Sequence, residues 1–373
     1  MDLWIQNYLI CTLISVVLTG LIIPKILLIA FRKKLFDEID ERKIHRGVVP
    51  RLGGIAFLPA ILFSFLLVVG VCVRYGHGFS ATTFTTAEIP VLFVFCSLML
   101  IYVVGIADDL IGVRYRAKFI FQIIAGALIV VSGVWISNLH GFLWIWGWPA
   151  WIGIPATVFL VILVMNAINL IDGIDGLASG LCMIALIYYS CVFMYCGFYL
   201  YALLAGATLG ALLPFFYYNV FGRAENHNKI FMGDTGSLTI GTVLVFLTIM
   251  VFNIPVAPGG ENEFVLAIAP IIVPCFDVVR VFMHRVRRGS NPFLPDKCHI
   301  HHKLLALGMP QWKALILILI ADAAFVAGNL ILSSTMQPTW LILGDIAVWV
   351  LLNVLLTRMI RNREKCLGQT LYE

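Results

Sequence analysis

The sequence predicts an all-α polytopic membrane protein that forms a single helical bundle. Of its 373 residues, 61% are hydrophobic and only 12% are Asp, Glu, Lys or Arg, and the mean hydropathy is +0.99. Soluble domains carry about 25% charged residues, so lipid must be the solvent for most of this chain. Backbone polar groups that face lipid have to be satisfied within their own segment, and this requirement makes the apolar segments helices.

Eleven segments are apolar over about 20 residues, the length that crosses a bilayer. The connections around the fifth, sixth and seventh are short, so the count is ten or eleven. The segments lie near residues 5–30, 53–73, 89–107, 118–137, 151–170, 177–197, 199–218, 238–254, 263–283, 312–332 and 339–357.

The basic residues predict the orientation of these helices. With the N-terminus outside, 21 of the 25 Lys and Arg fall in connections on the cytoplasmic side, three more lie at helix ends on that side, and only Arg74 falls elsewhere. Because Lys and Arg stay on the cytoplasmic side during insertion, we expect the C-terminus inside. The net charge of +5 then reports orientation and not nucleic-acid binding. The cytoplasmic segments are 31–52, 108–118, 171–176, 219–237, 284–311 and 358–373.

Polar motifs mark the ends of helices on this same side. They are G-I-A-D-D-L-I-G, with Asp108 and Asp109; N-A-I-N-L-I-D-G-I-D-G-L, with Asn166, Asn169, Asp172 and Asp175; F-M-G-D-T-G-S, with Asp234; and D-K-C-H-I-H-H-K, with His299, His301 and His302. Burial of acids crowded at a membrane boundary either raises their pKa values or requires cations to compensate their charge. Magnesium suits such a site because it takes few protein oxygens and completes its shell with substrate phosphates. The amides of Asp234 to Ser237, which precede an apolar helix, are also expected to suit a phosphate.

Other interpretations of these residues are simpler. Any one acid could be solvated at a helix end, and Asp172 and Asp175 could cap the next helix. A zinc site at the histidines with Cys298 is disfavoured, since structural zinc ligands come in separated pairs. A transporter is the alternative from another class, because Asp322 and Asp345 lie inside apolar segments, but the halves of the chain show no repeat.

Taken together, the motifs resemble those of the polyprenyl-phosphate N-acetylhexosamine-1-phosphate transferases over nearly the whole chain. R-K-I-H-R-G-V-V-P-R-L-G-G (42–54) resembles the first cytoplasmic motif of that family. The resemblance implies a single domain over residues 1–373, with its active site formed by the cytoplasmic loops. It also implies transfer of a sugar-1-phosphate from a UDP-sugar to a polyprenyl phosphate such as undecaprenyl phosphate, with release of UMP.

The resemblance implies a role for each matched residue. Asn169 and Asp234 match magnesium ligands, with Mn²⁺ as a substitute ion, and Asp108, paired with Asp109, matches a base that readies the lipid phosphate. For the donor, Lys118 matches a lysine that holds the diphosphate, Asp175 matches a uracil contact, and Asp172 belongs to the same motif as Asp175. The remaining matches are donor-recognition residues, His299, His301 and His302, and substrate contacts, Lys43, His45 and Arg51. Asp277, in P-C-F-D-V-V-R, is given no chemical role. Asp108 could instead position the acceptor, because a phosphate monoester is mostly dianionic near neutral pH, or form an aspartyl-phosphoryl intermediate.

The histidine motif bears on the sugar. Ile300 separates His299 from His301 and His302, whereas the branch that uses UDP-MurNAc-pentapeptide shows three contiguous histidines. We therefore expect UDP-GlcNAc or a related UDP-N-acetylhexosamine, with the phospho-MurNAc-pentapeptide transferase as the alternative. The resemblance places the protein in a bacterial cytoplasmic membrane and leaves a homodimer open.

Overall fold

A computed structural model describes residues 2–35, 48–75, 89–254, 262–289, 291, 298–367 and 372. Ten helices among these residues are long and apolar enough to cross a membrane, which confirms the expected all-α polytopic fold. Lys43 and His45 lie outside the described residues.

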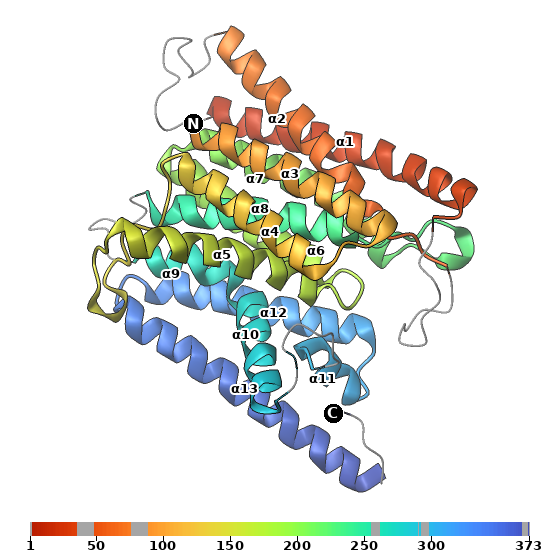
Figure 1. Cartoon of the computed structure of the whole chain (residues 1–373), viewed down its shortest axis with the longest axis vertical. Helices are drawn as coiled ribbons and strands as arrows, with labels where there is room; N and C mark the ends of the chain where they lie inside the picture. Colours follow the sequence, from red (N-terminus) through yellow and green to blue (C-terminus); the bar gives the residue numbers. More distant parts are fainter. Residues whose placement is uncertain are drawn as a thin grey trace.

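The long helices lie side by side as a bundle (Figure 1). Short 3₁₀ turns at Gly53–Ala56, Phe142–Trp144, Ala224–Asn226 and Ala269–Ile271 connect or precede some of them. The α-helices are α1 (Asp2–Lys33), α2 (Phe57–Arg74), α3 (Ile89–Ile111), α4 (Tyr115–Val131), α5 (Ala150–Ile171), α6 (Leu177–Cys196), α7 (Tyr199–Val220), α8 (Gly233–Phe252), α9 (Glu263–Ile268), α10 (Ile272–Arg287), α11 (Ile300–Ala306), α12 (Gln311–Leu332) and α13 (Pro338–Leu367).

Helix α8 forms the centre of the bundle. All of its residues from Thr235 to Phe252 are buried, and it packs against α3, α5, α6 and α7. Two of its threonine hydroxyls are satisfied locally, because Thr242 and Thr248 donate to carbonyls one turn back at 2.8 Å. Gly241 lets the backbone approach Met165 of α5, because an added Cβ would lie 2.9 Å from the Met165 Cα. A helix whose side chains beyond the first turn are apolar or carry only small hydroxyl groups can be buried on every face.

Two of the expected spans differ from straight membrane-crossing helices. The segment 118–137 is helical only to Val131, and α4 has 17 residues. The segment 263–283 is broken into α9 and α10 by the 3₁₀ turn Ala269–Ile271, where Pro270 cannot donate a backbone hydrogen bond. Figure 1 shows α10 running across the direction of α5 and α12 instead of along them. A count of apolar residues could not detect this break.

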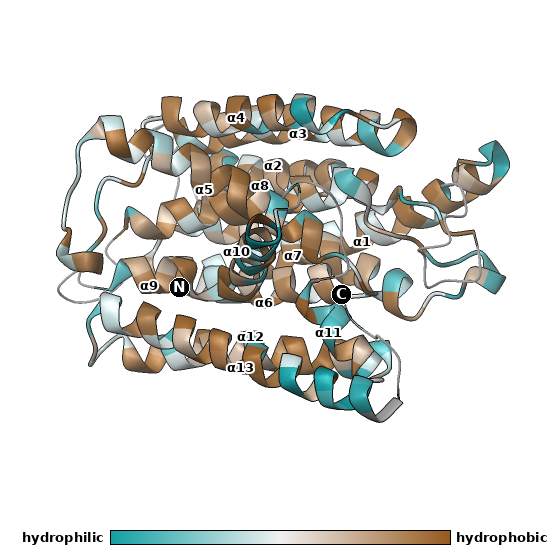
Figure 2. Ribbon diagram, turned by 60° about the horizontal axis from the view of Figure 1, so that its bottom comes forward, coloured by the Kyte–Doolittle hydropathy of each residue, from teal (hydrophilic) through white to brown (hydrophobic). Residues whose placement is uncertain are grey.

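The two ends of the bundle differ in polarity. Near the chain start, Trp4 stacks on Tyr199 at the beginning of α7, with ring centroids 4.4 Å apart, whereas the far end of α7 holds Asn219 beside the 172–176 loop. Tyr372, at the chain end, donates to the Cys298 carbonyl at 2.8 Å. The described N-terminal residues and the acidic motifs thus lie at opposite ends, and Tyr372 lies at the acidic end. Figure 2 shows hydrophilic residues in α11 and in the last turns of α13.

Candidate active site

Asp109 joins the end of α3 to the start of α8. One carboxylate oxygen accepts from the Asp234 backbone N–H at 2.7 Å, and the other accepts from the Thr235 backbone N–H and hydroxyl at 2.9 and 2.5 Å. These amides would otherwise lack partners at a buried helix start. The expectation that they face a phosphate is therefore wrong for Asp234 and Thr235, because Asp109 already occupies them. This geometry favours a positioning role for Asp109.

Glycines allow α3 and α8 to approach this closely. Gly233 has φ +73°, and an added Cβ would lie 2.6 Å from an Asp109 carboxylate oxygen. At Gly105, one turn before the acids, an added Cβ would lie 2.5 Å from the Thr235 Cα. The acids are thus positioned by a direct backbone contact between two helices.

Lys118 lies between two carboxylates. Its ammonium group forms ion pairs with both Asp108 and Asp234, and Asp108 also accepts from the Val113 backbone N–H at 2.6 Å. Lys118 comes from the first turn of α4, whereas the acids come from α3 and α8. The lysine compensates the repulsion between two acids that would otherwise face each other.

Asn169 completes this group from the last turn of α5. Its side-chain amide donates to Asp234 at 3.2 Å and to the Ser237 hydroxyl at 2.8 Å. Asp108, Lys118, Asn169 and Asp234 therefore form one connected cluster from four helices. One turn deeper, Asn166 and Gln122 form a side-chain hydrogen bond of 2.8 Å between α5 and α4, which fixes the spacing of the helices that carry Asn169 and Lys118.

The 172–176 loop follows α5 and carries two more acids. Asp175 pairs with Lys229 at 2.6 Å, and Asn219 of α7 accepts from the Gly176 backbone N–H at 2.6 Å. Burial and then the nearby Asp175 carboxylate raise the pKa of Asp172 to about 7, although the Arg51 guanidinium opposes the shift. Arg51 is exposed and belongs to a segment whose neighbour Gly53 donates to the Phe231 carbonyl at 3.0 Å. The Arg51 motif is thus brought to the site by pairing with the residues that precede α8.

The histidines reach the site from α11 and the residue before it. His301 is 1% exposed, and its ring lies against Gly173, where an added Cβ would lie 3.0 Å from the His301 Cδ2. Neither ring nitrogen of His301 has a hydrogen-bond partner among the described residues. Burial lowers the pKa of His301 well below its usual range, so the ring is neutral near pH 7. The His301 and His302 ring centroids are 4.1 Å apart.

The cluster has the chemistry that a magnesium ion requires, although it is not a preformed metal cage. No three His, Cys, Asp or Glu side chains are grouped to hold an ion within the part of the chain that the structure describes. Magnesium needs only one or two protein oxygens when phosphates supply the rest, and Asn169 and Asp234 are in contact. The Lys118 ammonium also shows that a positive charge is accommodated beside Asp234. The residues present therefore fit the ion.

Two residues of the site were not found by sequence reasoning. Lys229 and Asn219 have no role in the motifs, yet they hold Asp175 and Gly176 respectively. Lys229 stands five residues before Asp234, and it is one of only two basic residues between 219 and 237. A single lysine so close to an acidic motif could have indicated an ion pair with an acid of the site. Asn219, inside an apolar helix, was a similar signal.

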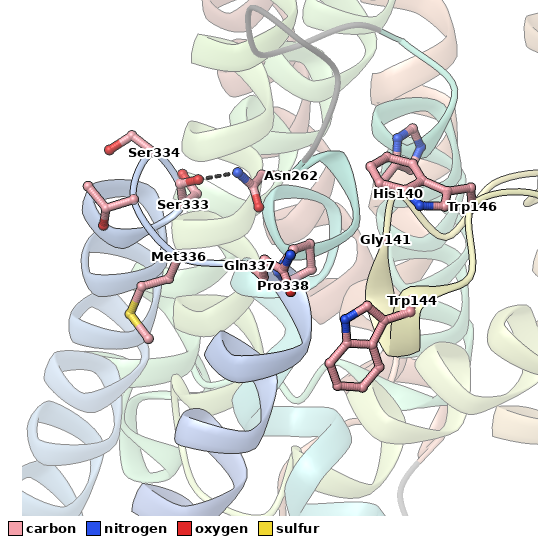
Figure 3. A pocket seen from close by; sticks show the side chains of 11 residues that line it. His140, Gly141, Trp144, Trp146, Asn262, Ser333, Ser334, Met336, Gln337 and Pro338 are labelled. Carbon is pink, nitrogen blue, oxygen red and sulfur yellow. Dashed lines mark hydrogen bonds between the residues drawn. The ribbon is translucent and has the colours of Figure 1, made fainter.

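A separate pocket of about 240 Å³ lies at the other end of the bundle (Figure 3). His140, Trp144 and Trp146 line one side of it, and Asn262 and the turn between α12 and α13 line the other. His140 also contacts the Phe252 carbonyl at 2.9 Å, at the end of α8 that is opposite to Asp234. This pocket is therefore not part of the acidic cluster.

Fold and site together define a polytopic membrane protein with a charged cluster of two carboxylates, a lysine and an asparagine where four helices meet. The sequence profile of glycosyl transferase family 4 matches residues 91–252, the stretch that contributes Asp108, Lys118, Asn169 and Asp234. The undecaprenyl-phosphate alpha-N-acetylglucosaminyl 1-phosphate transferase of Escherichia coli K12 is 30% identical over 321 residues, which cover 84% of this chain and 81% of that protein.

Two further relatives carry similar names. The Yersinia pestis protein of the same name is 28% identical, over 85% of this chain and 82% of its own length. A Bacillus subtilis protein named probable undecaprenyl-phosphate N-acetylglucosaminyl 1-phosphate transferase is 28% identical, over 91% of this chain and 88% of its own. The chain belongs to glycosyl transferase family 4.

Proposed function

We propose that this protein transfers GlcNAc-1-phosphate from UDP-GlcNAc to undecaprenyl phosphate and releases UMP. The observation that supports this most directly is the cluster in which Lys118 joins Asp108 and Asp234 beside Asn169. Phosphoryl transfer depends on charge compensation and positioning more than on covalent help from the protein, and this cluster supplies both. The names of the relatives favour GlcNAc over the MurNAc-pentapeptide branch.

The reaction is a single in-line displacement. An oxygen of the lipid phosphate attacks the sugar-linked phosphorus of the donor, and the bond from that phosphorus to the bridging oxygen breaks. UMP leaves with the bonding electron pair. Because the acceptor phosphate is mostly dianionic near neutral pH, it needs no base, and Asp108 acts by positioning Lys118, with which it forms an ion pair. Lys118 shifts from the carboxylates toward the donor diphosphate and compensates its charge.

The other site residues bind and orient the donor. The 172–176 loop, stiffened by Lys229 and Asn219, faces the nucleotide, and the neutral His301 ring lies beside it. Asn169 and Asp234 are the residues that would hold Mg²⁺, with Mn²⁺ as a substitute. When bound, this ion withdraws negative charge from the diphosphate.

The position of the cluster suits both substrates. It lies at one end of a bundle of apolar helices, where a lipid phosphate can arrive from the bilayer and a nucleotide from water. The excess of Lys and Arg in the loops at that end supports its assignment to the cytoplasmic face of a bacterial inner membrane. The multi-pass bundle itself is established by the ten candidate spans in the described ranges.

The decisive assay measures UMP release by the purified protein. We expect release from UDP-GlcNAc only when undecaprenyl phosphate and Mg²⁺ are both present, with loss on chelation and recovery on adding Mg²⁺ or Mn²⁺. Asp234→Ala should abolish release. Asp345→Ala is a matched control, because Asp345 of α13 accepts a hydrogen bond from Asn329 of α12 at 2.9 Å, away from the cluster. UMP release that is unchanged by a chelator, or that continues at the full rate in Asp234→Ala, would contradict the proposed site.

A further inference from the structure

Asp277 of α10 is a fully buried acid that the proposed reaction does not use. Its side chain is 0% exposed. One carboxylate oxygen lies 2.9 Å from His299 Nδ1, and the Ile300 backbone N–H donates to both oxygens at 3.1 and 3.2 Å. Asp277 therefore holds the residue before α11 and the first residue of α11 at once.

Arg280, one turn further along α10, compensates the Asp277 charge. Its guanidinium donates to Asp277 at 2.7 Å and to the Cys298 carbonyl at 2.6 Å. A buried carboxylate is tolerated when it is paired and its lone pairs are used, and both conditions are met here. The Asp277–Arg280 pair thus forms hydrogen bonds with three successive residues, Cys298 to Ile300.

The contact with Asp277 determines which nitrogen of the His299 ring carries a proton and how the ring is oriented. A carboxylate only accepts hydrogen bonds, so the His299 nitrogen that faces it must carry the proton. The same contact sets the ring plane. The His299 and His301 rings are nearly parallel, with an interplanar angle of 8° and centroids 5.8 Å apart. The orientation of His299 is therefore passed on to the ring that lies against Gly173.

We propose that Asp277 is a positioning residue that, through His299 and the start of α11, holds His301 against the 172–176 loop for binding of the nucleotide-sugar donor. This inference rests on the proposed function and deepens it. The inference gives a role to α10, the helix that crosses the direction of its neighbours. This helix carries the Asp277–Arg280 pair, which positions the histidines. Asp277 acts through His299 and touches no substrate.

A second set of hydrogen bonds holds α11 in place when the contacts of the Asp277–Arg280 pair are weakened. Lys303 donates to Asn353 at 3.0 Å and to Thr357 at 3.1 Å, both in α13. Loss of Asp277 should therefore disturb the histidines without releasing the whole helix. For this reason the expected effect is on donor binding, and not on the amount of folded protein.

The test compares Asp277→Asn with Asp322→Asn. Asp322, in α12, is also 0% exposed, so the control makes the same substitution at an equally buried acid. The readouts are kcat and the separate KM values for UDP-GlcNAc and undecaprenyl phosphate, with UDP-GlcNAc binding measured by calorimetry in the presence of Mg²⁺. For Asp277→Asn we expect KM and Kd for UDP-GlcNAc to rise about tenfold, as for loss of a charge-assisted hydrogen bond. The KM for undecaprenyl phosphate and all values for Asp322→Asn should stay unchanged.

Combination with His299→Ala separates positioning from mere folding. If Asp277 acts through His299 and the start of α11, the double variant binds UDP-GlcNAc less weakly than the sum of the two single effects predicts. A lower kcat with unchanged donor KM would indicate only fewer folded molecules and would overturn the inference, as would fully additive effects. Should wild-type protein bind UDP-GlcNAc without releasing UMP, the proposed function fails while the binding comparison still decides the role of Asp277. Wild-type protein that neither binds nor turns over UDP-GlcNAc overturns both.

Discussion

Substitution of Gly105 by Ala should impair catalysis by separating two helices at the active site. Gly105 lies in α3 one turn before Asp108 and Asp109. A Cβ at this position would lie 2.5 Å from the Thr235 Cα and 2.9 Å from the Thr235 backbone nitrogen, whereas ordinary contact begins at 3.4 Å. Because the obstructing atoms are backbone, α3 and α8 must move apart by about 1 Å.

The displacement acts directly on the cluster. Thr235 bonds Asp109, and Asp234 is its neighbour, so the distance from Asp108 to Asp234 changes with it. A misplacement of about 1 Å costs about 10²-fold in rate, and overpacking destabilises by about 1–3 kcal/mol. We therefore expect Gly105→Ala to reduce kcat about 100-fold and to lower the melting temperature in detergent.

Gly328→Ala is the matched control for this experiment. Gly328 lies within α12, and nothing is within 4 Å of its added Cβ. Alanine is favoured over glycine in a helix by about 1 kcal/mol, so this variant should keep full activity and melt at the same or a higher temperature. UMP release per folded molecule, with folded protein quantified by size-exclusion chromatography, is the assay. Full activity of Gly105→Ala at an unchanged melting temperature would refute the packing argument.

Three further substitutions test other parts of the site. Lys118→Gln should lower kcat/KM for UMP release about 10²–10³-fold, since it removes a preorganised charge, and a loss below tenfold would speak against a diphosphate contact. Burial raises the pKa of Asp172 to about 7, so ionising it in the folded state costs stability that accumulates as the pH rises from about 4 to 7. Asp172→Asn should thus have a higher melting temperature than wild type at pH 8, and this difference in melting temperature should become smaller toward pH 4. A difference that does not change with pH would argue against this reasoning. Gly173→Ala should raise the KM for UDP-GlcNAc about tenfold by displacing His301, and an unchanged KM would remove His301 from the donor site.

The sequence was sufficient to predict most of the helices and most of the described residues that meet at their ends. Apolar length located the spans because lipid enforces it, and the motif that carries Asp234 does begin a buried helix. Sequence reasoning did not predict which polar groups pair. Asp109 stands beside Asp108, yet the two carboxylates have different partners because consecutive residues of a helix point in different directions.

Breaks and long-range pairs could not be predicted from local composition. The segment 263–283 is apolar throughout, and the turn between α9 and α10 depends on Pro270 and on neighbouring helices. Lys229 and Asp175 are 54 residues apart in the chain, so no local pattern joins them. Asp277 was noticed but had no role until the structure placed it against His299.

The sharing of Lys118 between two acids has a consequence for the enzyme at rest. A site designed for a cation usually has surplus negative charge that pushes its walls apart when empty. Here the protein supplies its own counterion, which keeps Asp108 and Asp234 together before any substrate arrives. The cluster is therefore held together by the protein's own lysine, and the Mg²⁺ that we propose would serve turnover and not folding.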